Sequence, residues 1–258
     1  MKFPLRLSLD LWRARLSETS GRNGAEAIFH LPAAMLPALH ESGRGAVLDE
    51  HAPRAADSLR AAARTRTPVV WIGGGEPLDH SEVGRVAFAL NRRGRNVFLH
   101  TDGQRLRQRI HEFRPEPRLF LTVELAGREK THDASVGREG AFRRAIEAIR
   151  AAKLSGFHVC AHVTVNENSN VCAAGELFDY LDGHDVDGFV VSSGGRAIGS
   201  AAGALEETLE DIRALVRCSR WESFSRLLEA SYAARGERAA VAVTPVPEGE
   251  GGAVEESA

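Results

Sequence analysis

The chain is poor in cysteine. Its 258 residues include three cysteines, Cys160, Cys172 and Cys218, which are widely spaced and form no C-x-x-C pair. This scarcity argues against a disulfide framework and against a zinc ribbon, because both need closely grouped thiols. Unpaired cysteines are typical of a reducing compartment, so we expect the protein to be cytoplasmic.

Net charge, aromatic residues and long apolar runs are also scarce. The net charge of −2 provides no basic field for nucleic acid, and an aromatic content of 6% leaves few rings for stacking bases. No apolar run reaches about 18 residues, so the sequence predicts no transmembrane helix. The N-terminus lacks the apolar segment of about 7–15 residues that marks a signal peptide. The length suits one α/β barrel-type domain or two small domains.

Residues 1–17 have the pattern of an amphipathic helix. Four large apolar side chains recur at helical spacing, with Leu7 and Leu11 close to them and basic residues around them: Leu5, Leu9, Trp12 and Leu16. We expect this stripe to pack across one end of the domain. The alternative is a peripheral helix on an anionic membrane surface, at the inner membrane face. A polar linker follows, so residues 1–24 form a first segment.

Apolar strands alternate with helices about six times between residues 25 and 236. The expected strands are 25–31, 69–72, 96–100, 118–125, 157–165 and 186–192. The expected helices are 52–66, 82–93, 104–113, 139–154, 172–181 and 205–236, the last broken near Ser219. Such alternation predicts parallel β/α units, in either a barrel or a doubly wound sheet. Residues 237–258 are acidic with few apolar side chains, which predicts a disordered tail.

A glycine-rich turn follows the strand that begins at Val69. The apolar run stops at Gly73-Gly74-Gly75-Glu76-Pro77. Glycine lets backbone groups approach a ligand closely, because no Cβ intervenes. Polar or glycine-rich residues also follow three other strands, and ligand sites in parallel sheets gather at the carboxyl ends of strands. A tight turn without a ligand is the alternative.

Several motifs together resemble the radical S-adenosylmethionine (SAM) superfamily, and within it the adenosylhopane synthase-like branch of hopanoid biosynthesis. The residues that carry the resemblance are Gly74-Gly75-Glu76-Pro77, His100-Thr101-Asp102-Gly103, Val123-Glu124-Leu125-Ala126-Gly127, His132-Asp133, Arg138-Glu139-Gly140, Phe142 and Lys2-Phe3-Pro4-Leu5-Arg6-Leu7. The resemblance covers roughly residues 1–17 and 68–195 and implies a partial (β/α)6 TIM-type barrel, with the N-terminal helix and C-terminal helices added.

The resemblance also implies the cofactor site. In the family the G-G-E-P loop holds the amino group of SAM, so the implied cofactor-binding residues lie at the carboxyl ends of the strands: Gly74, Gly75, Glu76, Pro77, Thr101, Asp102, Glu124, Thr164 and Ser192. Glu124 at a strand end suits a ribose or the role of a base, and a surface ion pair with Arg128 or Lys130 is its alternative.

The chain departs from the family where the cluster should bind. Radical SAM enzymes hold a [4Fe–4S] cluster through C-x3-C-x2-C after the first strand, yet no cysteine precedes Cys160. We therefore expect no [4Fe–4S] cluster. The leading hypothesis is a degenerate, non-catalytic member that binds SAM or a nucleotide, or that partners an intact radical SAM enzyme or another protein. The alternative is an active enzyme with unexpected cluster ligands or a cluster-free SAM reaction.

Two further groups were candidates for chemistry. His132-Asp133 is adjacent in sequence, and the resemblance makes it a structural loop element rather than an acid–base pair. His158, Cys160 and His162 share one face of a strand, which suits zinc, but no fourth ligand is visible nearby, so we predict no metal. No residue is assigned a catalytic role.

Overall fold

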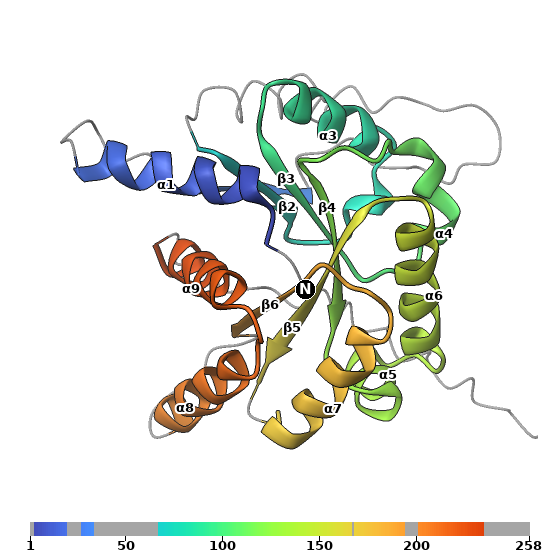
Figure 1. The fold of residues 1–258 in the computed structure, drawn as a ribbon. Helices are drawn as coiled ribbons and strands as arrows, with labels where there is room; N and C mark the ends of the chain where they lie inside the picture. Colours follow the sequence, from blue (N-terminus) through green and yellow to red (C-terminus); the bar gives the residue numbers. More distant parts are fainter. Residues whose placement is uncertain (1–2, 20–26, 34–66, 167, 194–200, 235–258) are drawn as a thin grey trace, which may run out of the picture.

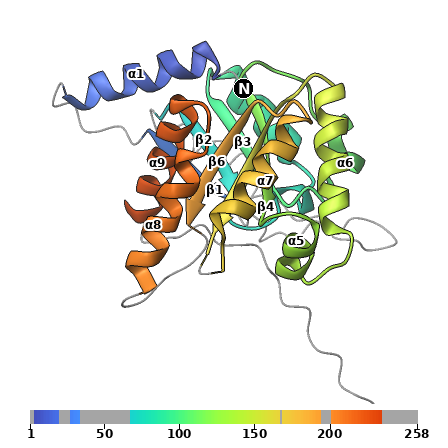
Figure 2. The same ribbon diagram turned by 60° about the horizontal axis from the view of Figure 1, so that its bottom comes forward.

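The computed structural model describes residues 3–19, 27–33, 67–166, 168–193 and 201–234. Six parallel strands form one sheet in sequence order, curled into a partial TIM barrel (Figures 1 and 2). They are β1 (Ile28–Pro32), β2 (Val69–Gly73), β3 (Asn96–Thr101), β4 (Leu119–Leu125), β5 (His158–Val165) and β6 (Gly188–Ser193). A doubly wound sheet would reverse its strand order at a switch point. The order β1 to β6 contains no reversal, so the predicted barrel type is confirmed.

Helices follow the strands as the alternation predicted. They are α3 (Val83–Arg92), α4 (Leu106–Arg109), α5 (Glu129–Val136), α6 (Ala141–Leu154), α7 (Val171–Asp182), α8 (Ala201–Ala214) and α9 (Ser219–Ala234), with short 3-10 helices η2 (Pro77–Asp79) and η3 (Ile110–Glu112). The predicted break near Ser219 separates α8 from α9. The predicted helix 52–66 and the predicted tail 237–258 lie outside the described residues. Residues 194–200, between β6 and α8, also lie outside them.

The helix expected over residues 104–113 is wrong in part. The chain forms α4 for one turn and then tightens into η3. The Arg109 side chain explains the change, because its guanidinium is buried and donates hydrogen bonds to the carbonyl oxygens of Leu78 and His80. Its remaining N–H groups reach the Glu112 carboxylate. These contacts fix the end of the helix against the loop after β2.

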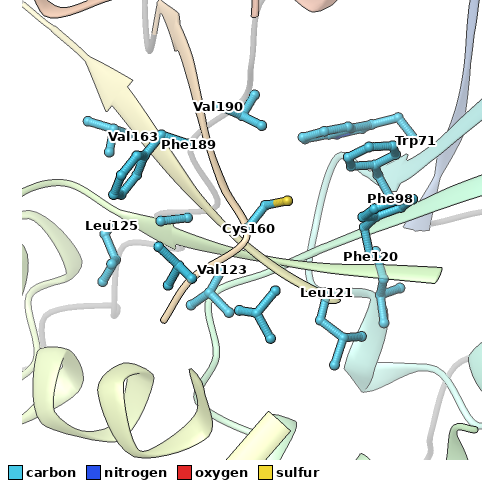
Figure 3. Close-up of a cluster of buried hydrophobic side chains, with 14 of the residues drawn as sticks. Trp71, Phe98, Phe120, Leu121, Val123, Leu125, Cys160, Val163, Phe189 and Val190 are labelled. Atoms are coloured by element: carbon cyan, nitrogen blue, oxygen red, sulfur yellow. The ribbon is translucent and has the colours of Figure 1, made fainter. Parts of the chain in front are cut away.

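The two faces of the sheet carry different side chains because successive residues of a strand alternate. On the convex face, toward α3, α6 and α7, the side chains are mainly aliphatic, and Phe189 stacks on Phe178 of α7 at 4.4 Å between ring centroids. On the other face an aromatic layer lies deep in the barrel, where Phe98 stacks on Phe120 at 4.5 Å and on Phe224 of α9 at 4.7 Å between ring centroids. Figure 3 shows Trp71, Phe98 and Phe120 on one side of the strands and Leu121, Val123 and Leu125 on the other. Polar residues lie above this layer, toward the carboxyl ends of the strands.

The last helix, α9, joins the first and last strands of the sheet. Trp221 donates its indole N–H to the Asp187 carbonyl at 3.0 Å, and Ser225 Oγ accepts from the Val191 N–H at 3.0 Å. Near the other end of α9, Ser231 lies 2.7 Å from His30 Nε2 of β1. The helix therefore closes the concave side of the open barrel.

The N-terminal helix α1 (Leu5–Thr19) packs across the amino end of the sheet, as expected, but not with the expected face. Leu7 and Ala14 are buried, and Asp10 bonds to Asn96 and Arg118 at the starts of β3 and β4. The predicted core stripe of Leu5, Leu9, Trp12 and Leu16 is exposed. The prediction was wrong because one buried leucine, the small Ala14 and the Asp10 contacts determine which face of the helix docks.

Candidate functional site

Glu76 is the centre of the loop after β2. Its carboxylate caps η2 by accepting the Leu78 N–H at 2.8 Å, and it accepts the Asp102 N–H at 2.8 Å and the Thr101 hydroxyl at 2.9 Å. The turn requires glycine, because Gly74 and Gly75 have φ angles of 72° and 133°. Five predicted residues, together with Pro77 at the first position of η2, are thus brought to one point between β2 and β3.

The Glu76 carboxylate is electrostatically unusual. Burial raises its pKa well above the ordinary value, and the negative charge of neighbouring Asp102 raises it further. The two backbone N–H bonds act in the opposite direction but more weakly. No lysine or arginine of the described residues forms an ion pair with it. A half-buried acid beside a second acid is stabilised by a cation, so this loop favours a positively charged ligand.

Glu124 and Thr164 form a second polar group at the ends of β4 and β5. The Thr164 hydroxyl donates to Glu124 Oε1 at 2.9 Å, and Glu124 Oε2 lies 3.5 Å from His100 Nε2. Glu124 therefore faces the concave side of the sheet. The alternative of a surface ion pair is wrong, because the Glu124 carboxylate is largely buried against His100 and Thr164 and forms no ion pair with Arg128 or Lys130 among the described residues.

A buried chain of hydrogen bonds continues from this group to Ser192. His100 Nε2 is 2.8 Å from His162 Nδ1, and His162 Nε2 is 2.7 Å from Ser192 Oγ. Burial lowers the pKa of both imidazoles, and His162 is lowered well below its ordinary value, with His100 as the second cause. The two histidines are thus held neutral. The sequence interpretation did not connect them, although both lie on the concave face near strand ends.

Two buried polar groups beside these hydrogen-bonded histidines have no hydrogen-bond partner among the described residues. They are the indole N–H of Trp71 and the hydroxyl of Thr122. The Trp71 ring lies 5.4 Å from His100 and 5.6 Å from His162 between centroids, and Thr122 pairs with His100 in the sheet register. Buried donors are normally satisfied by protein, water or ligand. These two groups on the concave face could therefore form hydrogen bonds with a bound water molecule or ligand.

The His132-Asp133 pair has a structural role, as predicted, although it lies in α5 rather than in a loop. His132 Nδ1 accepts the Ala126 N–H at 3.2 Å. The Asp133 carboxylate accepts the Gly140 and Phe142 N–H groups at 2.6 and 2.8 Å, which fixes the start of α6.

The described residues contain no group of three or more histidine, cysteine or acidic side chains arranged to hold a metal ion. His158 Nδ1 lies 3.8 Å from Asp187 Oδ1, so this imidazole does not join Cys160 and His162 in a zinc site.

The three cysteines do not form a site for an iron–sulfur cluster. Cys160 is buried among apolar side chains (Figure 3), and burial raises the pKa of its thiol well above the usual value. Cys172 is exposed on α7, and Cys218 lies just before α9. Cluster iron is bound by thiolates grouped at one place. The donor set of this chain therefore does not fit a cluster bound by its own cysteines.

The chain belongs to the radical SAM superfamily, whose family model matches residues 43–181. Among solved structures it is similar to SuiB of Streptococcus suis bound to S-adenosylmethionine, with a TM-score of 0.57, 15% identity, and coverage of 80% of this chain and 52% of SuiB. SuiB bound to its precursor peptide SuiA gives a TM-score of 0.54 and 14% identity, over 79% of this chain and 50% of SuiB. At such identity these likenesses show the fold.

Two curated relatives are similar over part of the chain. Pre-heme d1 synthase of Dinoroseobacter shibae is 27% identical over 145 residues, which is 55% of this chain and 35% of the relative. Fe-coproporphyrin III synthase of Methanosarcina barkeri is 26% identical over 117 residues, 45% of this chain and 29% of the relative. The chain thus spans about a third of the length of these relatives. Superfamily membership is confirmed, whereas neither relative supports the hopanoid branch.

Proposed function

We propose that this protein binds S-adenosylmethionine at the carboxyl ends of its strands without holding a [4Fe–4S] cluster on its own cysteines. The observation that carries the proposal is the half-buried Glu76 carboxylate, which adjoins Asp102 and forms no ion pair within the described residues. SAM carries an ammonium and a sulfonium, so it brings positive charge to an acidic loop. The glycine turn leaves the backbone beside Glu76 open to such a ligand.

The residues of the chain have separate tasks in this proposal. Glu76 accepts hydrogen bonds from the ammonium, and Thr101 and the Asp102 N–H keep its carboxylate oriented. Glu124 and Thr164 are placed to contact ribose hydroxyls, which donate and accept hydrogen bonds as these side chains require. Ser192 is a more distant contributor, because it acts through His162 and His100.

In the superfamily the cluster supplies the electron that cleaves SAM. The thiols of this chain do not fit that group, so we propose a role in which SAM or a nucleotide is bound and not cleaved by a radical mechanism. The protein would then act with a partner, either an intact radical SAM enzyme or another protein. The adenosylhopane synthase-like branch stays a prediction from the sequence motifs.

Calorimetric titration with SAM tests the binding proposal. We expect Glu76→Gln to weaken binding about 10- to 100-fold, because a charge-assisted hydrogen bond contributes about 1.5–3 kcal/mol. Glu139→Gln, at an exposed position, is the matched control and should leave the affinity unchanged. Equal affinity of wild type and Glu76→Gln, or no binding by the wild type, would refute the proposal. Titration with 5′-methylthioadenosine, which lacks the amino-acid part, distinguishes nucleoside binding from recognition of the ammonium.

Anaerobic reconstitution with iron and sulfide tests the other half of the proposal. We expect the protein to take up no stoichiometric cluster. Uptake of about four irons per chain with the absorbance of a [4Fe–4S] centre would show that unexpected ligands hold one, and the proposal would fail. A Cys160→Ser/Cys172→Ser/Cys218→Ser variant then identifies whether any thiol contributes.

A second candidate function is a cluster-free reaction that uses SAM. The buried chain Glu124–His100–His162–Ser192 favours it, because a carboxylate next to a neutral imidazole can take a proton from a nucleophile. The measurement is conversion of SAM to S-adenosylhomocysteine in the presence of candidate nucleophiles. Activity that Glu124→Gln removes and Glu139→Gln retains would support this function, and activity equal in both variants would contradict it.

A further inference from the structure

Helix α1 carries a stripe of large apolar side chains that are exposed in the described part of the structure. Its side chains are among the most exposed large apolar groups of the described residues: Leu5 at 69%, Leu9 at 43%, Trp12 at 59% and Leu16 at 46%. They are spaced by four, three and four residues, so they form one straight band along the outer side of the helix. A band of this kind on a surface marks a site of interaction.

The orientation of α1 is fixed, so the stripe cannot turn inward. Leu7 is fully buried on the opposite side, and Phe3 packs edge-on against Trp221 with a centroid distance of 4.7 Å. Asp10 is hydrogen-bonded to Asn96 at 3.0 Å and paired with Arg118. These contacts attach the helix to the amino end of the barrel, where it projects beyond the sheet (Figure 1).

Arginines flank the stripe on both sides. At about 100° per residue, Arg6 and Arg13 fall on one side of the band and Arg15 on the other, and all three are exposed. The acidic Asp10 points toward the barrel, where it is paired with Arg118, and it also lies 3.7 Å from the guanidinium of the exposed Arg13. The outer side of the helix thus combines an apolar band with positive edges, which suits an anionic, amphiphilic partner.

A groove continues the stripe toward α9. It has a volume of about 450 Å³, and its apolar lining includes Leu9, Trp12 and Leu227, while Arg15 and Arg220 also line it. An apolar groove with cationic groups matches the chemistry of an acyl chain that ends in a phosphate headgroup. The groove and the band form one continuous surface.

We propose that α1 docks this protein on an anionic lipid bilayer. The helix lies in the plane of the interface, with Leu5, Leu9, Trp12 and Leu16 in the acyl boundary and the arginines on lipid phosphates. A second copy of the chain is a poorer occupant, because a two-fold pairing of identical stripes brings arginines together. None of the described helices has the length and apolarity that crossing a bilayer requires.

Tryptophan fluorescence gives a direct test, independent of any SAM binding. Trp71 and Trp221 are buried at 1% and 0% exposure, whereas Trp12 is exposed. Addition of vesicles of phosphatidylcholine and phosphatidylglycerol should shift the emission to shorter wavelength and carry the full chain into the vesicle pellet. Pure phosphatidylcholine vesicles should bind much more weakly, and high salt should reduce binding to the anionic vesicles.

Variants separate the apolar from the charged contribution. Leu5→Ser/Leu9→Ser should abolish the emission shift, and Arg6→Gln/Arg13→Gln/Arg15→Gln should lower binding about a hundredfold, because each basic residue near an anionic surface contributes about 1 kcal/mol. Leu154→Ser is the control, since Leu154 is 90% exposed on α6, away from α1. All these side chains are exposed, so the variants should keep the wild-type circular dichroism spectrum.

Four outcomes would overturn the proposal. The first is no binding to anionic vesicles, and the second is equal binding to neutral and anionic vesicles. The third is loss of binding in Leu154→Ser to the same degree as in Leu5→Ser/Leu9→Ser. Lipid-free dimerisation that shields Trp12 would also overturn it and would assign the stripe to contact between protein copies.

Discussion

At the scale of single residues, Glu76 links the turn to the proposed ligand. Its carboxylate stays between β2 and β3 because Thr101 and the Asp102 N–H hold it there. Burial and the Asp102 charge make its ionised form unfavourable, which is why its pKa is raised. A bound cation would reverse this balance, so a proton and SAM should compete for the same carboxylate.

We therefore predict that SAM binding is coupled to proton release. Affinity should increase as the pH rises through the raised pKa of Glu76, because ionisation then no longer opposes binding. Titrations in two buffers with different ionisation enthalpies measure the number of protons released. The release should disappear in Glu76→Gln and persist in Glu139→Gln. Release that is the same in both variants would exclude Glu76 as the group that titrates.

The sequence allowed part of the site to be predicted. Glu76, Thr101 and Asp102 were assigned because their motifs resemble those of the radical SAM superfamily, and the structure brings the three residues into contact. His100 and His162 were not paired, because they lie on β3 and β5 with β4 between them. Their contact depends on the curvature of the sheet, and no local pattern in the sequence reports curvature.

At the scale of secondary-structure elements, the strands were easier to predict than the helices. The boundaries of β2 to β6 agree with the expected ranges to within two residues, since buried parallel strands are apolar runs that end at polar or glycine residues. The prediction of which face of α1 is buried was wrong, because the spacing of apolar residues identifies a stripe but does not determine whether the stripe packs against the barrel. Burial depends on Leu7 and Asp10 contacts with distant residues.

The contact between β6 and α9 gives a prediction at this scale. A Cβ at Gly188 would overlap the Trp221 indole, and Trp221 is fully buried. We expect Gly188→Ala to lower the free energy of unfolding by about 1–3 kcal/mol, as overpacking in a core does. Urea denaturation measures the change.

Gly203→Ala is the matched control. Gly203 lies in α8 with nothing within 4 Å of an added Cβ, so alanine should stabilise the protein by about 0.5–1 kcal/mol through its helix propensity. The two substitutions should therefore have opposite signs. Destabilisation of equal size at both positions would show that the Trp221 contact is not the cause.

At the scale of the whole molecule, buried histidines should make stability depend on pH. Burial lowers the pKa of His100, His132 and His162 in the folded protein. The unfolded chain therefore takes up protons below about pH 6.5 that the folded protein does not, and stability is lost as the pH falls through that value. Glu76 opposes this trend, because its raised pKa favours the folded state at lower pH.

We expect the urea midpoint to fall as the pH decreases from about 7 to about 5, because His184 as well as the three buried histidines has a lowered pKa and only Glu76 acts in the opposite direction over this range. His162→Gln should make this dependence shallower, whatever its effect on absolute stability. His111→Gln, at an exposed site, should leave the slope unchanged. A wild-type midpoint that is constant over this range would contradict the assignment.

The bridge that α9 makes between the edge strands also has a consequence for synthesis of the protein. His30 of β1 and Ser231 of α9 are separated by 201 residues. At translation rates of about 5–20 residues per second, β1 leaves the ribosome on the order of ten seconds or more before its partner helix exists. The contact between β1 and α9 therefore forms only after residue 231 has been synthesised, which makes it one of the late contacts of the folding chain.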